Sequence, residues 1–161
     1  MLFFGHVGLS LGAGKLLERL QRRIDFLFLG LGAIFPDVDK LLSVALGIGG
    51  RAFFHTLVFA IALTAVALAL RTVFLRSFAL GVWLHLLFDT MWTFPQTFFW
   101  PFLGSFNSET FNADVALHYF FVDSFILTTE IAGFAIVMWL VYKEKLYKKH
   151  VLIDKMRKKR T

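Results

Sequence analysis

The sequence predicts an all-α protein: a polytopic helical bundle that is integral to a membrane. Hydrophobic residues make up 58% of its 161 residues, 21 of them Phe, and the mean hydropathy is +0.70. A soluble domain of this length needs fewer apolar residues for its core. Apolar segments recur along the whole chain, which excludes a signal peptide or a lone anchor as the explanation. We expect one transmembrane helical domain at 1–142 and a basic cytoplasmic tail at 143–161.

About five membrane segments are expected, with the first two short or broken. Residues 2–14 are few and rich in glycine. Residues 24–48 are apolar but contain Pro36, which removes a backbone donor and marks a helix boundary or kink. Residues 52–70 contain no Asp, Glu, Lys or Arg and approach the ~20 residues that cross ~30 Å of hydrocarbon. The remaining segments are 77–94 and 119–141.

The basic residues predict the orientation of these segments. If all five cross, only Lys40 and Arg51 of the 17 Lys and Arg residues lie on the outer side, a strong positive-inside signal. We therefore expect an inner-membrane protein with a cytoplasmic C-terminus. The aromatic stretch FPQTFFWPFLGSF at 94–106 suits the outer interface. The tail is interpreted as an orientation signal that contacts anionic lipid, because it has no recognisable nucleic-acid-binding motif.

Several ionisable residues are predicted to share one depth in the outer half of the membrane. A rise of ~1.5 Å per residue places His6, Asp37, His85 and Asp89 about 14–20 Å from the inner face, and His55 about 6 Å from the outer end. An ionisable group in hydrocarbon is costly and is by default functional. In HLLFD, His85 and Asp89 are at i and i+4, so both lie on one helix face.

Imidazoles and carboxylates at one depth predict a divalent metal site. The chain has no cysteine, so Zn, Mn, Fe or Mg would be held by N and O ligands, as one ion or two. In an alternative interpretation, Asp37 and Asp39 only cap a helix after Pro36. Whether Glu130 or His118 joins the site is left open. The predicted ligands are His6, Asp37, Asp39, His55, His85 and Asp89.

Five ordered motifs resemble those of a known family. They are GHVGLSLG (5–12), FPDVDK (35–40), RAFFHTL (51–57), HLLFDTM (85–91) and FFWPF (98–102). They resemble the YdjM-like, LexA-regulated family of membrane-bound metal-dependent hydrolases. The resemblance covers residues 5–102 and implies the same six residues as the polar centre. Where the family commonly has a His after its second Asp, this chain has Lys40, which removes one ligand from a second metal position.

The sequence thus favours a membrane-embedded metal-dependent hydrolase that acts on a lipid-linked ester or phosphoester on the outer side. Asp39 or Asp89 is the candidate general base, and the planar fork of Arg51 suits a phosphate. Membrane lipid is the expected partner, and the oligomeric state is not predicted. A metal-ion or proton transporter is the alternative function. A polar network that only fixes helix register is a third interpretation.

Overall fold

The computed structural model describes residues 2–20, 23–46, 50–106, 118 and 120–143, and these contain helices but no strand. The all-helical prediction is therefore confirmed. Apart from Lys143, the predicted basic tail lies outside the described residues, as does 107–117 of the outer loop. The α-helices are α1 (Phe3–Arg19), α2 (Phe26–Ile34), α3 (Val38–Leu46), α4 (Leu57–Leu70), α5 (Val73–Phe88), α6 (Pro95–Phe98) and α8 (Ser124–Lys143). The 3-10 turns are η1 (Phe35–Asp37), η2 (Phe53–His55) and η3 (Met91–Thr93).

Side-chain caps fix where three of the helices begin. Asp25 Oδ1 accepts hydrogen bonds from the backbone N–H groups of Leu27 and Phe28 at the start of α2. Thr56 and Thr72 accept in the same way at the first turns of α4 and α5. Each cap satisfies a backbone donor that the helix itself cannot pair. The chain therefore enters these helices at defined residues.

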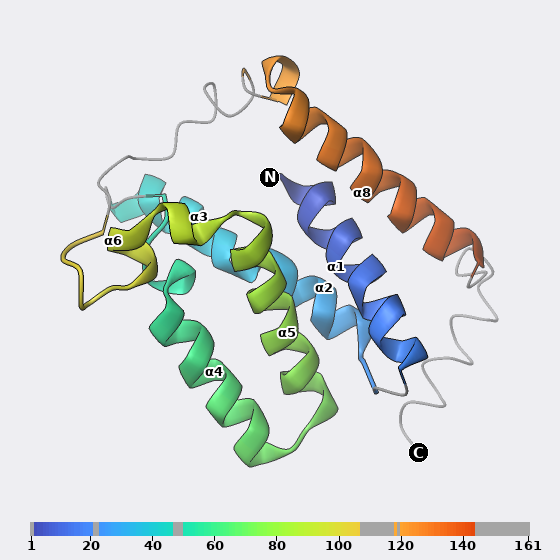
Figure 1. The fold of residues 1–161 in the computed structure, drawn as a ribbon, viewed down its shortest axis with the longest axis horizontal. Coiled ribbons are helices and arrows are strands. Elements are labelled where there is room, and N and C mark those ends of the chain that lie inside the picture. Colours follow the sequence, from blue (N-terminus) through green and yellow to red (C-terminus); the bar gives the residue numbers. More distant parts are fainter. Residues whose placement is uncertain (1, 21–22, 47–49, 107–117, 119, 144–161) are drawn as a thin grey trace.

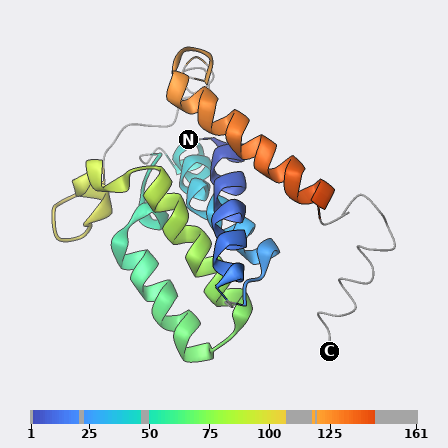
Figure 2. The same ribbon diagram turned by 45° about the vertical axis from the view of Figure 1, so that its right-hand side comes forward.

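The long helices pack as neighbours in the spatial order α8, α1, α2, α5, α4 (Figure 1). Figure 2 also shows α8 running beside α1. Glycines allow the closest approaches. A Cβ at Gly32 of α2 would collide with the Phe78 carbonyl of α5, and one at Gly8 of α1 with the Gly133 carbonyl of α8. Small residues at such crossings let helix backbones touch, as in membrane bundles.

The helices are shorter than the predicted membrane segments. The segment predicted at 52–70 begins with the turn η2, so α4 starts only at Leu57, and the segment predicted at 77–94 leaves the helix after Phe88. Among the described residues, α8 alone is long and apolar enough to cross a membrane, while α4 and α5 are shorter apolar helices. Helix length therefore does not confirm the prediction of five spans.

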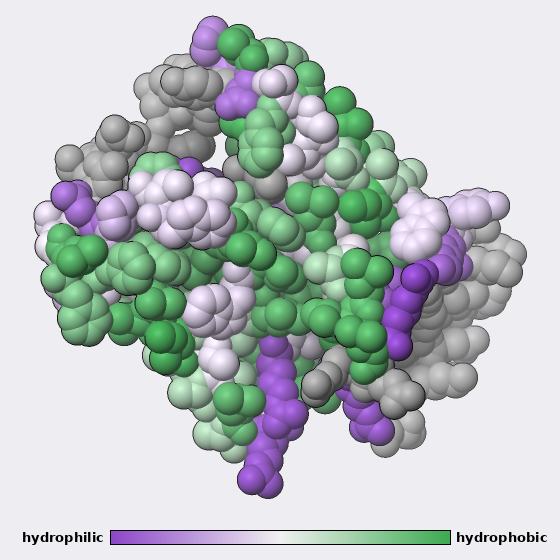
Figure 3. Space-filling view, in the orientation of Figure 1, coloured by the Kyte–Doolittle hydropathy of each residue, from purple (hydrophilic) through white to green (hydrophobic). Residues whose placement is uncertain are grey.

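Apolar side chains cover much of the described surface. Figure 3 shows hydrophobic residues over most of one face, with hydrophilic residues in a few places. Ile61 and Leu68 of α4 and Phe134 and Trp139 of α8 are all exposed. An apolar surface of this extent marks contact with lipid or with another protein. Polar residues, by contrast, are buried where α1, η1, η2 and α5 meet.

Candidate metal centre

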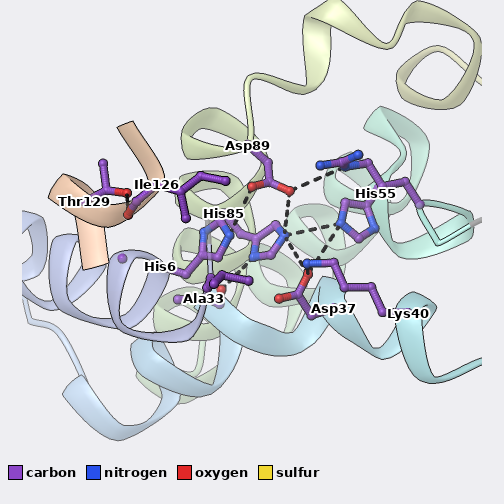
Figure 4. Close-up of polar contacts among 12 residues, drawn as sticks. His6, Ala33, Asp37, Lys40, His55, His85, Asp89, Ile126 and Thr129 are labelled. Carbon is purple, nitrogen blue, oxygen red and sulfur yellow. Dashed lines mark hydrogen bonds and ion pairs between the residues drawn. The ribbon is translucent and has the colours of Figure 1, made fainter. Parts of the chain in front are cut away.

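The polar cluster lies where helices begin or end. His6 is in the first turns of α1, Asp37 is in η1, and His55 is in η2. His85 lies in the last turn of α5, and Asp89 is the residue that caps its C-terminal end. Figure 4 shows these five side chains facing one another from α1, η1, η2 and the end of α5. The side chains of all three histidines are fully buried.

Hydrogen bonds fix the tautomers of His55 and His85. His85 Nδ1 lies 2.7 Å from the carbonyl oxygen of Ala33. Since a carbonyl can only accept, Nδ1 holds the hydrogen and Nε2 of the neutral ring has a free lone pair. His55 Nδ1 lies 2.9 Å from Asp39 Oδ2, so its Nε2 is free for the same reason. In their neutral forms, both rings therefore present an unprotonated nitrogen to the centre.

The two free nitrogens face each other. His55 Nε2 and His85 Nε2 are 3.3 Å apart. With both rings neutral, two lone pairs at this distance repel each other unless a cation lies between them. Tetrahedral ligands at the usual zinc–nitrogen distance are separated by about 3.3 Å. The spacing and the tautomers therefore both fit a shared metal ion.

Two carboxylates complete the candidate ligand set. Asp37 Oδ1 is 3.6 Å from His85 Nε2 and 3.9 Å from His55 Nε2, and Asp89 Oδ2 is 3.9 Å from His85 Nε2. Two groups could hold an ion: Asp37 with His55 and His85, and His6 with His85 and Asp89. His85 belongs to both but has a single free nitrogen. It can therefore bind an ion in only one of them.

Asp39 lies behind His55 and faces away from the shared nitrogens. Its Oδ2 accepts hydrogen bonds from the backbone N–H groups of Ala52 and Phe54, 2.9 and 3.0 Å away, and from His55 Nδ1. The two carboxylates of PDVD thus contact different sides of the cluster. The sequence analysis predicted both Asp37 and Asp39 as ligands. In the structure, Asp39 instead binds the backbone around η2 and orients the His55 ring. Such contacts behind a metal-binding imidazole set its tautomer and basicity.

His6 reaches the cluster from α1. Its ring stacks on that of His85, with centroids 4.0 Å apart and an interplanar angle of 17°, and its Nε2 lies 3.1 Å from Asp89 Oδ1. Within the described part of the chain, neither His6 nitrogen makes a hydrogen bond that meets the usual geometry. His6 therefore adds an imidazole nitrogen beside Asp89 to the second candidate group.

Glu130 anchors α1 and lies outside both candidate groups. Its carboxylate accepts from the backbone N–H groups of Leu2, Phe4 and Gly5 at 2.8–2.9 Å. The helix has no capping side chain of its own at Leu2, so Glu130 of α8 supplies the cap from outside. Sequence reasoning left open whether Glu130 joins the site. Its position in an apolar helix indicated a function but not the partner.

His118, the other residue left open, is exposed and is in neither candidate ligand group.

Two cations flank the cluster. Arg51 Nε is 3.6 Å from Asp89 Oδ2, and its guanidinium lies over the Phe94 ring, 4.6 Å from the centroid. Lys40 Nζ forms an ion pair with Asp37 Oδ1. If the imidazoles are neutral, the carboxylates of Asp37, Asp39 and Asp89 carry three negative charges against two positive charges, which leaves one negative charge in excess. The cluster is therefore suited to an additional cation.

Sequence reasoning missed two contacts of the cluster. One is the Ala33 carbonyl, for which the sequence has no signal. The other is the Lys40 ion pair, which its i,i+3 spacing from Asp37 could have indicated.

Comparison with known proteins supports the resemblance noted in the sequence. The family described as YdjM inner membrane protein matches residues 1–154. No match was found among curated proteins or among solved structures. The family match extends beyond the motifs at 5–102 and includes all the residues of the candidate centre. The chain therefore belongs to the YdjM inner membrane protein family.

Proposed function

We propose that this membrane protein is a metal-dependent hydrolase with one divalent ion, of Zn, Mn, Fe or Mg, held by His55, His85 and Asp37. The observation that supports it most directly is the pair of Nε2 atoms, 3.3 Å apart, on rings whose Nδ1 atoms both donate elsewhere. One ion is proposed because His85 has one free nitrogen. When bound, such an ion would polarise an ester and lower the pKa of a bound water.

Residues around the ion would bind the substrate and accept a proton. Asp89 is the candidate base, because its Oδ2 faces the centre, whereas Asp39 Oδ2 already accepts from three donors behind His55. Arg51 is half-buried and lies beside Asp89, so it would bind an anionic oxygen of the substrate. The guanidinium also lies over the Phe94 ring. This arrangement favours a phosphoester over a neutral ester.

A lipid-linked substrate follows from the proposed topology. We propose five membrane-crossing segments with a cytoplasmic C-terminus and a centre open to the outer side. α4 and α5 are about 21 and 24 Å long, less than the ~30 Å of hydrocarbon. The turns η2 and η3 would complete their crossings, as non-helical backbone at membrane depth is tolerated where protein covers it. The exposed apolar residues support lipid as the surrounding solvent.

The test is hydrolysis by the purified protein. Lipid phosphoesters are incubated with the untreated protein, with protein stripped by a chelator, and with stripped protein resupplied with Zn or Mn. We expect activity to disappear on stripping and to return with the metal, and His55→Ala to remain inactive. Thr64→Val is the control, since it removes a polar group of α4 that pairs with Trp83. A folded, metal-loaded protein without hydrolysis of any lipid phosphoester would contradict the enzyme and favour a transporter.

A further inference from the structure

Lys40 contacts the same carboxylate oxygen that faces the two free imidazole nitrogens. Its ammonium pairs with Asp37 Oδ1, and both side chains are largely shielded, with 18% and 26% of their surfaces exposed. That oxygen also lies 3.6 Å from His85 Nε2 and 3.9 Å from His55 Nε2. Figure 4 shows the lysine side chain extending to Asp37 beside the imidazoles. The ammonium is thus a cation at the edge of the proposed metal position.

We propose that Lys40 exchanges partners: it holds Asp37 in the metal-free protein and binds the phosphate of the substrate once an ion takes Asp37. The inference rests on the proposed metal centre. An ion that binds Asp37 Oδ1 must compete with the ammonium for it, because two cations at one oxygen repel each other. Lys40 therefore weakens binding of the metal.

Charge balance explains why the released ammonium would bind an anion. Three carboxylates and the two cations Lys40 and Arg51 surround the centre, so a divalent ion changes an excess of one negative charge to an excess of one positive charge. A partly buried ammonium without a counter-charge is costly. Arg51 lies beside Asp89 and Lys40 beside Asp37. A phosphate bound at the ion would therefore have two cations available to it, Lys40 from α3 and Arg51 from the segment before η2.

The test measures the affinities for metal and for phosphate. Loss of the Lys40 ammonium is expected to raise the first and lower the second. Metal binding is measured by titration of the stripped full-length protein with Zn or Mn, for the wild type, Lys40→Met and Lys40→Arg. We expect Lys40→Met to bind the ion about tenfold more tightly, and Lys40→Arg to resemble the wild type. The control is Lys15→Met, which removes a lysine from another i,i+3 ion pair, with Glu18 at the far end of α1.

Phosphate binding to the ion-loaded proteins is then measured with inorganic phosphate and with a short-chain phosphatidate. We expect Lys40→Met to bind both probes about tenfold more weakly, because they share the phosphate. A loss confined to the phosphatidate would place Lys40 against the lipid portion and overturn the exchange.

A merely structural role for Lys40 would weaken the binding of metal and phosphate together, and that result, or two unchanged affinities, would also overturn the proposal. If neither the wild type nor Lys40→Met binds an ion, the metal centre itself is wrong. If the wild type binds an ion and Lys40→Met binds it no more tightly, the metal centre is supported and only the proposed exchange of Lys40 is wrong.

Discussion

At the scale of single residues, hydrogen bonds made away from the centre determine which atoms face it. The Ala33 carbonyl and the Asp39 carboxylate each hold one Nδ1 hydrogen, and the free Nε2 atoms of His85 and His55 follow from that. A buried imidazole with both nitrogens engaged elsewhere would not be a ligand. The second contact of each ring is therefore as important to the site as the ring itself.

Asp39→Asn tests this second contact. The asparagine oxygen can still accept hydrogen bonds, but it lacks the negative charge that now binds three donors. The His55 ring is therefore held less firmly, and its Nε2 becomes a less basic ligand. We expect metal affinity to fall about 10- to 100-fold, as measured by titration. Asp25→Asn is the matched control, because an asparagine still caps α2. Equal losses in Asp39→Asn and His55→Ala would show instead that Asp39 is itself a ligand.

Glu130→Ala is expected to destabilise the protein by about 2 kcal/mol, because three partly or fully buried N–H groups at the start of α1 lose a charged acceptor. Glu130→Gln retains an acceptor and should lose less. The measurement is thermal unfolding in detergent, with Thr128→Ala as the control in α8, since the Thr128 hydroxyl donates to the Ser124 carbonyl of its own helix. A wild-type melting temperature for Glu130→Ala would mean that the cap contributes no stability.

The sequence predicted which side chains form the cluster better than it predicted their contacts. Unpaired His and Asp residues in apolar segments are visible in a sequence, because their burial is costly. Glu130 pairs with backbone groups 125 or more positions away, and Ala33 contributes only its carbonyl oxygen. Backbone acceptors have no sequence signature, so contacts of this kind required the fold.

At the scale of elements, the site is formed by helix ends. α2 continues into η1 at Pro36, α5 stops at Phe88, and α4 starts after η2. Each break brings one polar residue to the centre: Asp37, Asp89 and His55. Hydropathy predicted 52–70 and 77–94 as continuous segments because the turns that lie inside them, η2 and η3, are themselves rich in apolar and aromatic residues. Pro36 was the one break that the sequence signalled clearly.

The crossing of α1 and α8 depends on Gly8. A Cβ there would collide with the backbone of Gly133, so Gly8→Ala must separate the two helices, which we expect to cost about 1–3 kcal/mol. Gly12→Ala is the control on the same helix. Its Cβ would meet the Ile136 side chain at an ordinary 3.4 Å, so it should change stability by less than about 0.5 kcal/mol. Similar melting temperatures for the two variants would contradict the close crossing.

At the scale of the whole molecule, charge and hydropathy are typical of a membrane protein. The net charge is +6, and apolar residues are exposed on α4 and α8. Composition was sufficient to predict a helical membrane protein, which the helices and the family confirm. The number of crossings does not follow from it, because helices that end at a buried polar centre are shorter than the membrane.

Cysteine labelling tests the topology. The chain has no cysteine, so Ser105→Cys and Thr161→Cys each introduce a single thiol. We expect a membrane-impermeant maleimide to label Ser105→Cys from the outside of intact cells and to label Thr161→Cys only after the membrane is opened. Labelling of both from the same side would refute the five crossings and the outward-facing centre.

The measurement that tests the central claim most directly is elemental analysis of the purified protein by mass spectrometry. The wild type is compared with a His55→Ala, His85→Ala double variant that is shown to be folded by circular dichroism and gel filtration. We expect about one Zn, Mn, Fe or Mg per wild-type chain and none in the variant. A wild type that holds no such ion even after resupply would contradict the metal centre, and the contact between His55 and His85 would then be a hydrogen bond from a protonated ring.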